Sequence, residues 1–175
     1  FMGYFKKPEY TAEVFENGYF RTGDAGYLDE NGYVFLKDRI KDIIKTSSGK
    51  YIAPQKIESL LGVDKYIEQI TIIGSERKYV TALVVPAAIA FESLMTEMGL
   101  TDKPRAEQVK VPAVVAFYQQ RIDALQKDLS PYEQVKKIVL LPNEFTIQGG
   151  ELTPSLKIKR QVVSVQFKEE IESMY

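Results

Sequence analysis

Lysine, arginine, aspartate, glutamate and tyrosine are the side chains left to do chemistry in this chain, because its 175 residues contain neither histidine nor cysteine. Their absence removes Ser-His and Cys-His nucleophile pairs, disulfides and the commonest metal ligand. Three short segments, 20–24, 37–58 and 152–160, place charged side chains beside glycine or proline in turn-like sequence. Each segment alone is a weak signal of a binding site.

Asp24 directly follows Gly23 in the first segment, Phe20-Arg21-Thr22-Gly23-Asp24. An exposed carboxylate on such a turn can accept hydrogen bonds from the two vicinal hydroxyls of a ribose. The alternative is that Asp24 caps its own turn, as aspartates in turns commonly do.

The second segment, 37–58, carries Arg39, then Lys41, then Gly49 in a polar loop. Arg39 could meet a phosphate or a ribose with a forked pair of hydrogen bonds. Gly49 could let a ligand pass close to the backbone. The alternative is a solvated basic turn whose glycine serves only a positive φ.

Lys157 lies in the third segment, which is basic and follows Gly149-Gly150. A loop lysine close to the turn residue Pro154 is well placed to swing onto a phosphate. The alternative is a solvated charge run that precedes a helix.

Hydrophobic periodicity predicts an α+β fold in which helices and antiparallel strands are mixed. Asn31-Gly32 predicts a β-hairpin, and Pro54 marks the start of a helix. The other expected elements are a short strand over 42–45, an antiparallel pair over 67–73 and 79–85, helices over 87–98 and 106–129, with Pro112 marking a kink or a late start, a strand over 135–141, and a final amphipathic helix over 160–174.

Charge changes along the chain near residues 36–42. Residues 1–35 carry three basic and six acidic side chains, whereas residues 36–58 carry six basic and three acidic ones. This shift predicts a domain boundary.

The net charge of −1 gives no global field that favours nucleic acid or an anionic membrane, and no apolar run reaches membrane-spanning length. The turn-rich opening, without a signal peptide, indicates a piece of a longer protein.

In this order, the segments resemble the C-terminal part of an adenylate-forming acyl-CoA synthetase of the long-chain fatty acid type. Phe20–Asp24 matches the family's Tyr-Arg-Thr-Gly-Asp motif, and Asp38–Asp42 matches its hinge motif. Gly49 to Glu58 matches the Gly-x-x-Ile…Ile-Glu continuation, and Leu152–Arg160 matches the terminal lysine motif. Ser155-Leu156 replaces the usual Ser-Gly, a form associated with the long-chain branch.

The resemblance implies two domains. Residues 1–40 would be the last strands of a large N-terminal adenylation domain, and 41–175 would be a small mobile C-terminal lid of antiparallel strands and flanking helices. Lys157 would be catalytic, Asp24 and Arg39 would bind the nucleotide, Lys41 would be the hinge, and Gly49 would line the CoA channel. No residue here is expected to ligate a metal.

The implied reaction joins a fatty acid to CoA through an acyl-adenylate, consuming ATP with Mg²⁺ and releasing pyrophosphate and AMP. The chain alone would be inactive, because the missing N-terminal adenylation domain holds the phosphate loop and the fatty-acid tunnel. We expect a cytoplasmic protein without a nucleic-acid partner, and peripheral contact with a membrane stays open. The alternatives are the lid of an aryl acid or fatty acyl-AMP ligase, and a non-catalytic nucleotide-binding module.

Overall fold

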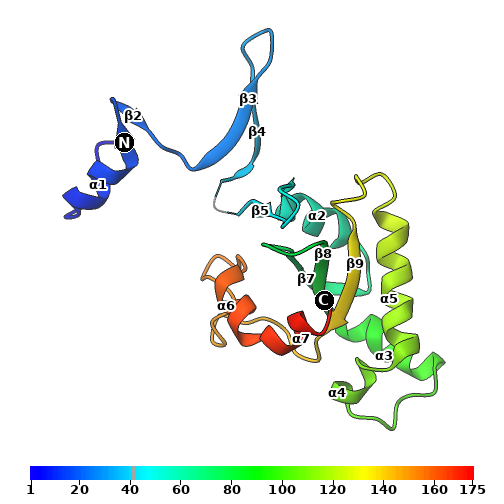
Figure 1. Cartoon of the computed structure of the whole chain (residues 1–175). Helices are drawn as coiled ribbons and strands as arrows, with labels where there is room; N and C mark the ends of the chain where they lie inside the picture. Colours follow the sequence, from blue (N-terminus) through cyan, green and yellow to red (C-terminus); the bar gives the residue numbers. More distant parts are fainter. Residues whose placement is uncertain (41) are drawn as a thin grey trace. The chain divides into compact units, whose positions relative to one another are not determined.

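The computed structural model describes residues 1–40 and 42–175, without the side chains of residues 37 and 38. Contacts within the chain divide it into two compact units, Phe1–Ile43 and Ile44–Tyr175 (Figure 1). The division lies close to the change in charge along the sequence.

The first unit consists of one short helix and two small antiparallel ladders. Helix α1 (Pro8–Val14) begins at a proline, which suits the first turn of a helix, and it was not predicted. Strands β1 (Phe15–Glu16) and β2 (Tyr19–Phe20) form one pair. Strands β3 (Asp24–Leu28) and β4 (Val34–Arg39) form the other, which confirms the hairpin predicted at Asn31-Gly32.

None of the described side chains of the first unit is buried. Its aromatic rings instead contact one another at the surface, as Phe15 does with Phe20 and Tyr27 does with Phe35. Two-stranded ladders without a hydrophobic core are only marginally stable by themselves. The helix and both ladders therefore have no buried core to stabilise them.

The second unit is built around a three-stranded sheet of β7 (Ile67–Ile73), β8 (Val80–Pro86) and β9 (Val135–Leu140) in that order. The antiparallel pairing of β7 with β8 was predicted and is confirmed. Strand β9 runs parallel to β8, whereas the sequence predicted only antiparallel strands. The long helical connection between β8 and β9 returns the chain to the same end of the sheet, as a parallel neighbour requires.

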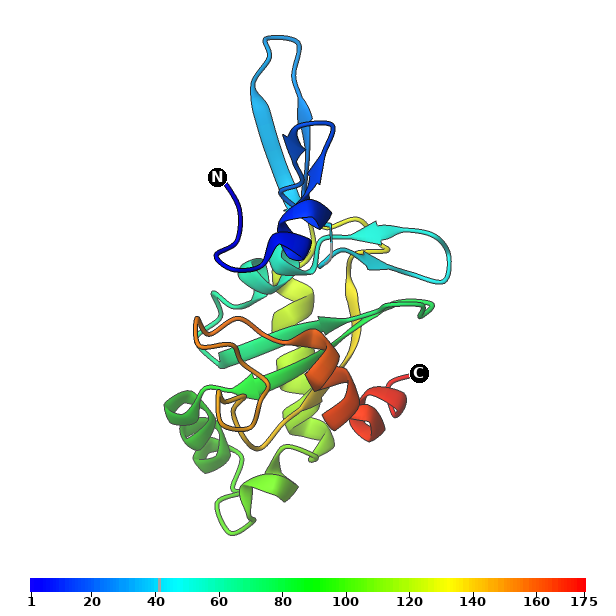
Figure 2. The same cartoon turned by 90° about the vertical axis from the view of Figure 1, so that its left-hand side faces the viewer.

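One face of this sheet is covered by three helices (Figures 1 and 2). They are α2 (Pro54–Leu61), α3 (Ala88–Glu97) and α5 (Pro112–Leu125), with the short α4 (Arg105–Gln108) in the connection. Pro112 therefore marks a late helix start. Side chains of these helices and alternate strand residues such as Ile72 and Val84 form one cluster of buried apolar side chains on this face.

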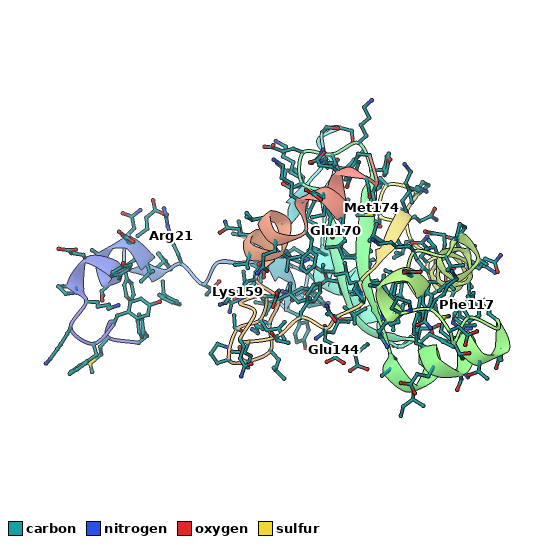
Figure 3. All side chains as sticks on the ribbon, turned by 90° about the horizontal axis from the view of Figure 1, so that it is seen from below. Arg21, Phe117, Glu144, Lys159, Glu170 and Met174 are labelled. Carbon is teal, nitrogen blue, oxygen red and sulfur yellow. The ribbon has the colours of Figure 1, made fainter. Side chains whose placement is uncertain are left out.

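The opposite face buries the intervening strand residues, among them Leu83 and Val85, against the C-terminal segment. Figure 3 labels Phe117 among the helices of the first face and Met174 in this second cluster. The predicted helix over 160–174 is two helices, α6 (Arg160–Gln166) and α7 (Lys168–Glu172). The chain bends at Phe167, whose ring packs edge-on against Phe145, so tertiary packing interrupts the helical pattern.

A separate small hairpin pairs β5 (Ile44–Lys45) with β6 (Tyr51–Ile52). Its first strand is shorter than the predicted 42–45. In the described part of the chain, none of the helices has the length and apolar character needed to cross a bilayer.

Candidate functional site

Asp24 and Arg39 lie opposite each other in the ladder of β3 and β4. The Arg39 Nε atom is 3.3 Å from Asp24 Oδ1, and the arginine is the more exposed partner. The backbone N–H of Asp24 also donates to Thr22 Oγ1 at 3.1 Å. Two residues predicted to bind a nucleotide from separate motifs are therefore neighbours across one pair of strands.

This ion pair borders an open hollow of about 860 Å³ within the first unit. Phe20, Arg21 and Thr22 line it beside Asp24 and Arg39. With Tyr4 and Glu13, which also line it, the hollow combines two aromatic rings, two carboxylates and two guanidinium groups. Such a set suits a ligand with a flat ring, a diol and negative charge.

Gly26 sets the geometry of this ladder, and the sequence analysis missed it. A β-bulge lies between Ala25 and Gly26. A Cβ atom added at Gly26 would lie 2.5 Å from the backbone oxygen of Phe35, a distance that real side chains do not tolerate. A glycine inside a strand is the sequence signal for a bulge or a close backbone approach. Gly26 thus permits the register that places Asp24 opposite Arg39.

Lys157 extends from a tightly hydrogen-bonded turn. Its backbone N–H donates to Thr153 Oγ1 at 3.0 Å, and its carbonyl accepts from the Thr153 N–H at 2.8 Å. Leu152 and Ile158 form a β-bridge that closes the turn. The Lys157 side chain is exposed. The turn therefore presents an ammonium group to solvent on a well-defined backbone.

Gly49 lies in the turn of the β5–β6 hairpin with a φ of +77°. Its N–H donates to the Thr46 carbonyl at 2.9 Å, and no atom lies within 4 Å of where a Cβ would stand. The backbone conformation favours glycine, while the space outside is open. Both the structural and the binding interpretation of Gly49 are compatible with this geometry.

Lys41, the predicted hinge, lies outside the described residues. Among those that are described, no group of three or more acidic side chains is placed so that it could hold a metal ion.

Comparison with known proteins decides the family. The model for the AMP-binding enzyme C-terminal domain matches residues 41–175, which is most of the chain. The chain belongs to this family.

Relatives with curated names extend the similarity over the whole chain. It is 33% identical over 176 residues to long-chain-fatty-acid–CoA ligase FadD15 of Mycobacterium tuberculosis, covering 100% of this chain and 29% of that protein. It is 36% identical over 179 residues to long-chain-fatty-acid–CoA ligase 5 of Mus musculus, covering 100% of this chain and 26% of that protein. The chain thus spans less than a third of the length of these relatives.

A solved structure supports the same fold. The adenylation domain of the carboxylic acid reductase from Segniliparus rugosus, in complex with AMP and a co-purified carboxylic acid, matches with a TM-score of 0.80 and 29% identity. The match covers 99% of this chain and 26% of that one. The chain is therefore the C-terminal part of an adenylate-forming enzyme, as its motifs predicted.

Within this AMP-binding C-terminal domain, the two candidate loops lie on different sides of the second unit. The β5–β6 hairpin that carries Gly49 projects from one side of the second unit, and the orange segment that carries Lys157 lies on the other side (Figure 2). The sequence motifs named both residues but could not give this separation.

Proposed function

We propose that this chain is the C-terminal part of a long-chain-fatty-acid–CoA ligase that activates a fatty acid with ATP and then transfers the acyl group to CoA. The names of the curated relatives support the substrate class. The observation that carries the chemistry is Lys157, an exposed ammonium group on a hydrogen-bonded turn. Because the relatives are more than three times longer, we expect the activity to belong to a longer protein.

The first step brings a carboxylate to the α-phosphate of ATP, and both groups are anionic. A preorganised cation at the reacting oxygens lowers the energy of the charge that develops in the transition state. We assign this role to Lys157. Asp24 would accept hydrogen bonds from the ribose hydroxyls, and Arg39, which already contacts Asp24, would hold the carboxylate in place and face the ribose or phosphate.

Mg²⁺ would supply charge neutralisation on the ATP phosphates. The residues that the structure describes include no acidic cluster that could hold it.

The second step needs a path for the thiol arm of CoA. We propose that Gly49 lines this path after the second unit has rotated about Lys41. The opposite placement of the Gly49 and Lys157 loops within the second unit is consistent with two faces used in turn. Gating by domain movement is a common way to separate two steps.

A second candidate is an adenylate-forming enzyme with a different acyl acceptor. The similarity to the adenylation domain of a carboxylic acid reductase favours it, since the match has a TM-score of 0.80 and covers 99% of this chain. The adenylation step and the roles of Lys157 and Asp24 would be the same. Only the role of Gly49 would change.

The test uses the full-length parent protein and two assays, fatty-acid-dependent release of pyrophosphate and formation of acyl-CoA from supplied acyl-adenylate. We expect Lys157→Ala to lower pyrophosphate release by about 10²–10³-fold, as loss of a preorganised charge-stabilising group does. We expect Gly49→Leu to lower mainly the second activity. Long-chain acids should be better substrates than aryl acids in the first assay.

Two control variants separate these roles from general damage. Lys159→Ala removes another exposed lysine two residues away and should leave both activities unchanged. Gly99→Leu imposes the same backbone strain, since Gly99 has a φ of +66° in equally open space, but it lies after α3. If Lys157→Ala retains pyrophosphate release, or if Gly99→Leu impairs CoA transfer as much as Gly49→Leu, the corresponding assignment is wrong.

A further inference from the structure

Arg160 begins α6 three residues after Lys157, and its guanidinium group forms a forked ion pair with Glu58 of α2. The Nη1 atom donates to Glu58 Oε1 at 2.7 Å, and Nη2 donates to Oε2 at 2.6 Å. The side chains are 21% and 14% exposed. A planar guanidinium that donates to both carboxylate oxygens makes a strong ion pair of defined geometry.

The same group is tied to the central sheet. Arg160 Nη1 also donates to Thr71 Oγ1 at 3.1 Å and to the Ile72 carbonyl at 3.2 Å. Glu58 Oε1 in turn accepts from the Ile72 backbone N–H at 2.8 Å. Thr71 and Ile72 are fully buried in β7. The ion pair therefore joins the end of the lysine loop to a buried strand of the central sheet.

The connection from this anchor to Lys157 is short and stiff. Three residues span at most about 10 Å even when extended. Between them, Ile158 is held by its bridge to Leu152, and the Lys159 N–H donates to the Glu151 carbonyl at 2.7 Å. A shift of Arg160 would therefore be passed on to the turn that carries Lys157.

Packing alone does not require this ion pair. Helix α6 is already attached through Val163, which is completely buried in the second cluster. Partly buried ion pairs are often no more stabilising than apolar side chains of similar size, because both charges lose their hydration. What the forked contact adds is a fixed position and orientation, and catalysis by a positioned cation depends on both.

We propose that Arg160, held by Glu58, is a positioning residue that fixes the Lys157 loop for the adenylation step. This inference rests on the proposed function of Lys157. It predicts that loss of the ion pair impairs the step that uses Lys157 and spares the step that uses the Gly49 face.

The experiment compares Arg160→Gln, Arg160→Lys and Glu58→Gln in the full-length protein by the same two assays. We expect Arg160→Gln and Glu58→Gln each to lower the kcat of pyrophosphate release by about tenfold or more, since small misplacements of a catalytic group have effects of up to about 10²-fold. The KM for ATP should change less than kcat. Arg160→Lys keeps the positive charge but cannot form the forked contact, so its kcat should lie between those of the unsubstituted protein and of Arg160→Gln. The double variant should be no worse than either single one.

Arg121→Gln is the matched control, because Arg121 also makes a forked ion pair, with Asp64, but at α5 and away from the lysine loop. It should lower the melting temperature comparably, while both activities stay close to those of the unsubstituted protein. Equal losses in both assays for Arg160→Gln, paralleling its loss of thermal stability, would show a purely structural role and overturn the inference. Should Lys157→Ala itself leave pyrophosphate release intact, the proposed function fails first, and the inference fails with it.

Discussion

Phe5 is 87% exposed in the first unit, whereas Phe91 is 1% exposed in the second. The contrast holds throughout. No described side chain of Phe1–Ile43 is buried, while Ile44–Tyr175 buries two apolar clusters on the two faces of its sheet. The second unit has the core of an independent domain, whereas the first exposes apolar side chains of the kind that mark an interaction surface.

The candidate functional residues divide along the same line. Asp24 and Arg39, which we assign to the nucleotide, lie on the unit without a core. Lys157 and Gly49, which we assign to the two steps, lie on turns of the unit with one. We infer that the residues that hold the nucleotide belong with the rest of a large domain, and that the self-sufficient unit is the part free to move.

The largest expected effect compares one substitution in both units. In a chain of these 175 residues, Phe91→Ala should lower the free energy of unfolding by about 3–5 kcal/mol, because it leaves a cavity in a packed core. Phe5→Ala should change it by less than about 0.5 kcal/mol, as substitutions at exposed sites do. Urea unfolding followed by far-ultraviolet circular dichroism measures both, and it suits a chain without tryptophan.

The same pair sharpens the domain proposal in the full-length protein. If the first unit packs against sequence outside this chain, Phe5→Ala should become measurably destabilising there while Phe91→Ala keeps its effect. An effect of Phe5→Ala that stays negligible in both proteins would contradict the assignment of residues 1–40 to a larger domain.

The next effect compares ion pairs. Asp64 has a side chain only 5% exposed, and it accepts from Arg121 and from the Tyr66 backbone N–H. Arg121→Gln would leave that carboxylate short of a counter-charge, at a cost of about 2 kcal/mol, below the value for fully buried pairs because Arg121 is partly exposed. Arg21→Gln breaks an exposed pair with Glu16 and should cost almost nothing. If Arg121→Gln and Arg21→Gln lower the free energy of unfolding equally in the urea experiment, the ion pairs of the two units do not differ in strength.

Sequence reasoning succeeded where local chemistry decides the structure. Asn31-Gly32 formed its hairpin, and Pro54 began its helix, because turn and capping preferences act over a few residues. Of the two alternatives left open at Pro112, a kink or a late start, the structure has the late start. It failed at Phe167, where packing against Phe145 splits a helical pattern. It also failed for the parallel pairing of β9, which depends on where a long connection returns the chain.

The candidate site divides in the same way. Motifs named Asp24, Arg39, Gly49 and Lys157, because their residue types and spacing carry the signal. The contact of Arg160 with Glu58 joins residues 102 positions apart, and nothing in the local sequence specifies it. Gly26 was detectable as a glycine within a strand, but its role depends on the partner backbone at Phe35.

The smallest expected effect is a dependence on pH confined to the second unit. Arg77 donates to Glu172 and thereby lowers the pKa of that carboxyl below its ordinary value of 4.5. Because the folded pKa is the lower one, the contribution to stability is complete above about pH 4.5 and is lost as the pH falls through the folded value.

Glu172→Gln should therefore lower the melting temperature slightly at pH 6, and this difference should shrink as the pH falls below 4.5. The effect is small because the carboxyl is half exposed and well solvated. Thermal melts from about pH 3 to 7, a range that brackets the ordinary carboxyl pKa, measure the gap in melting temperature between the unsubstituted protein and Glu172→Gln. Amide hydrogen exchange should place the loss of protection in α7 and the adjoining end of β8, with β3 and β4 unaffected. A gap that persists unchanged at pH 3 would mean that the ion pair does not hold α7 to the sheet.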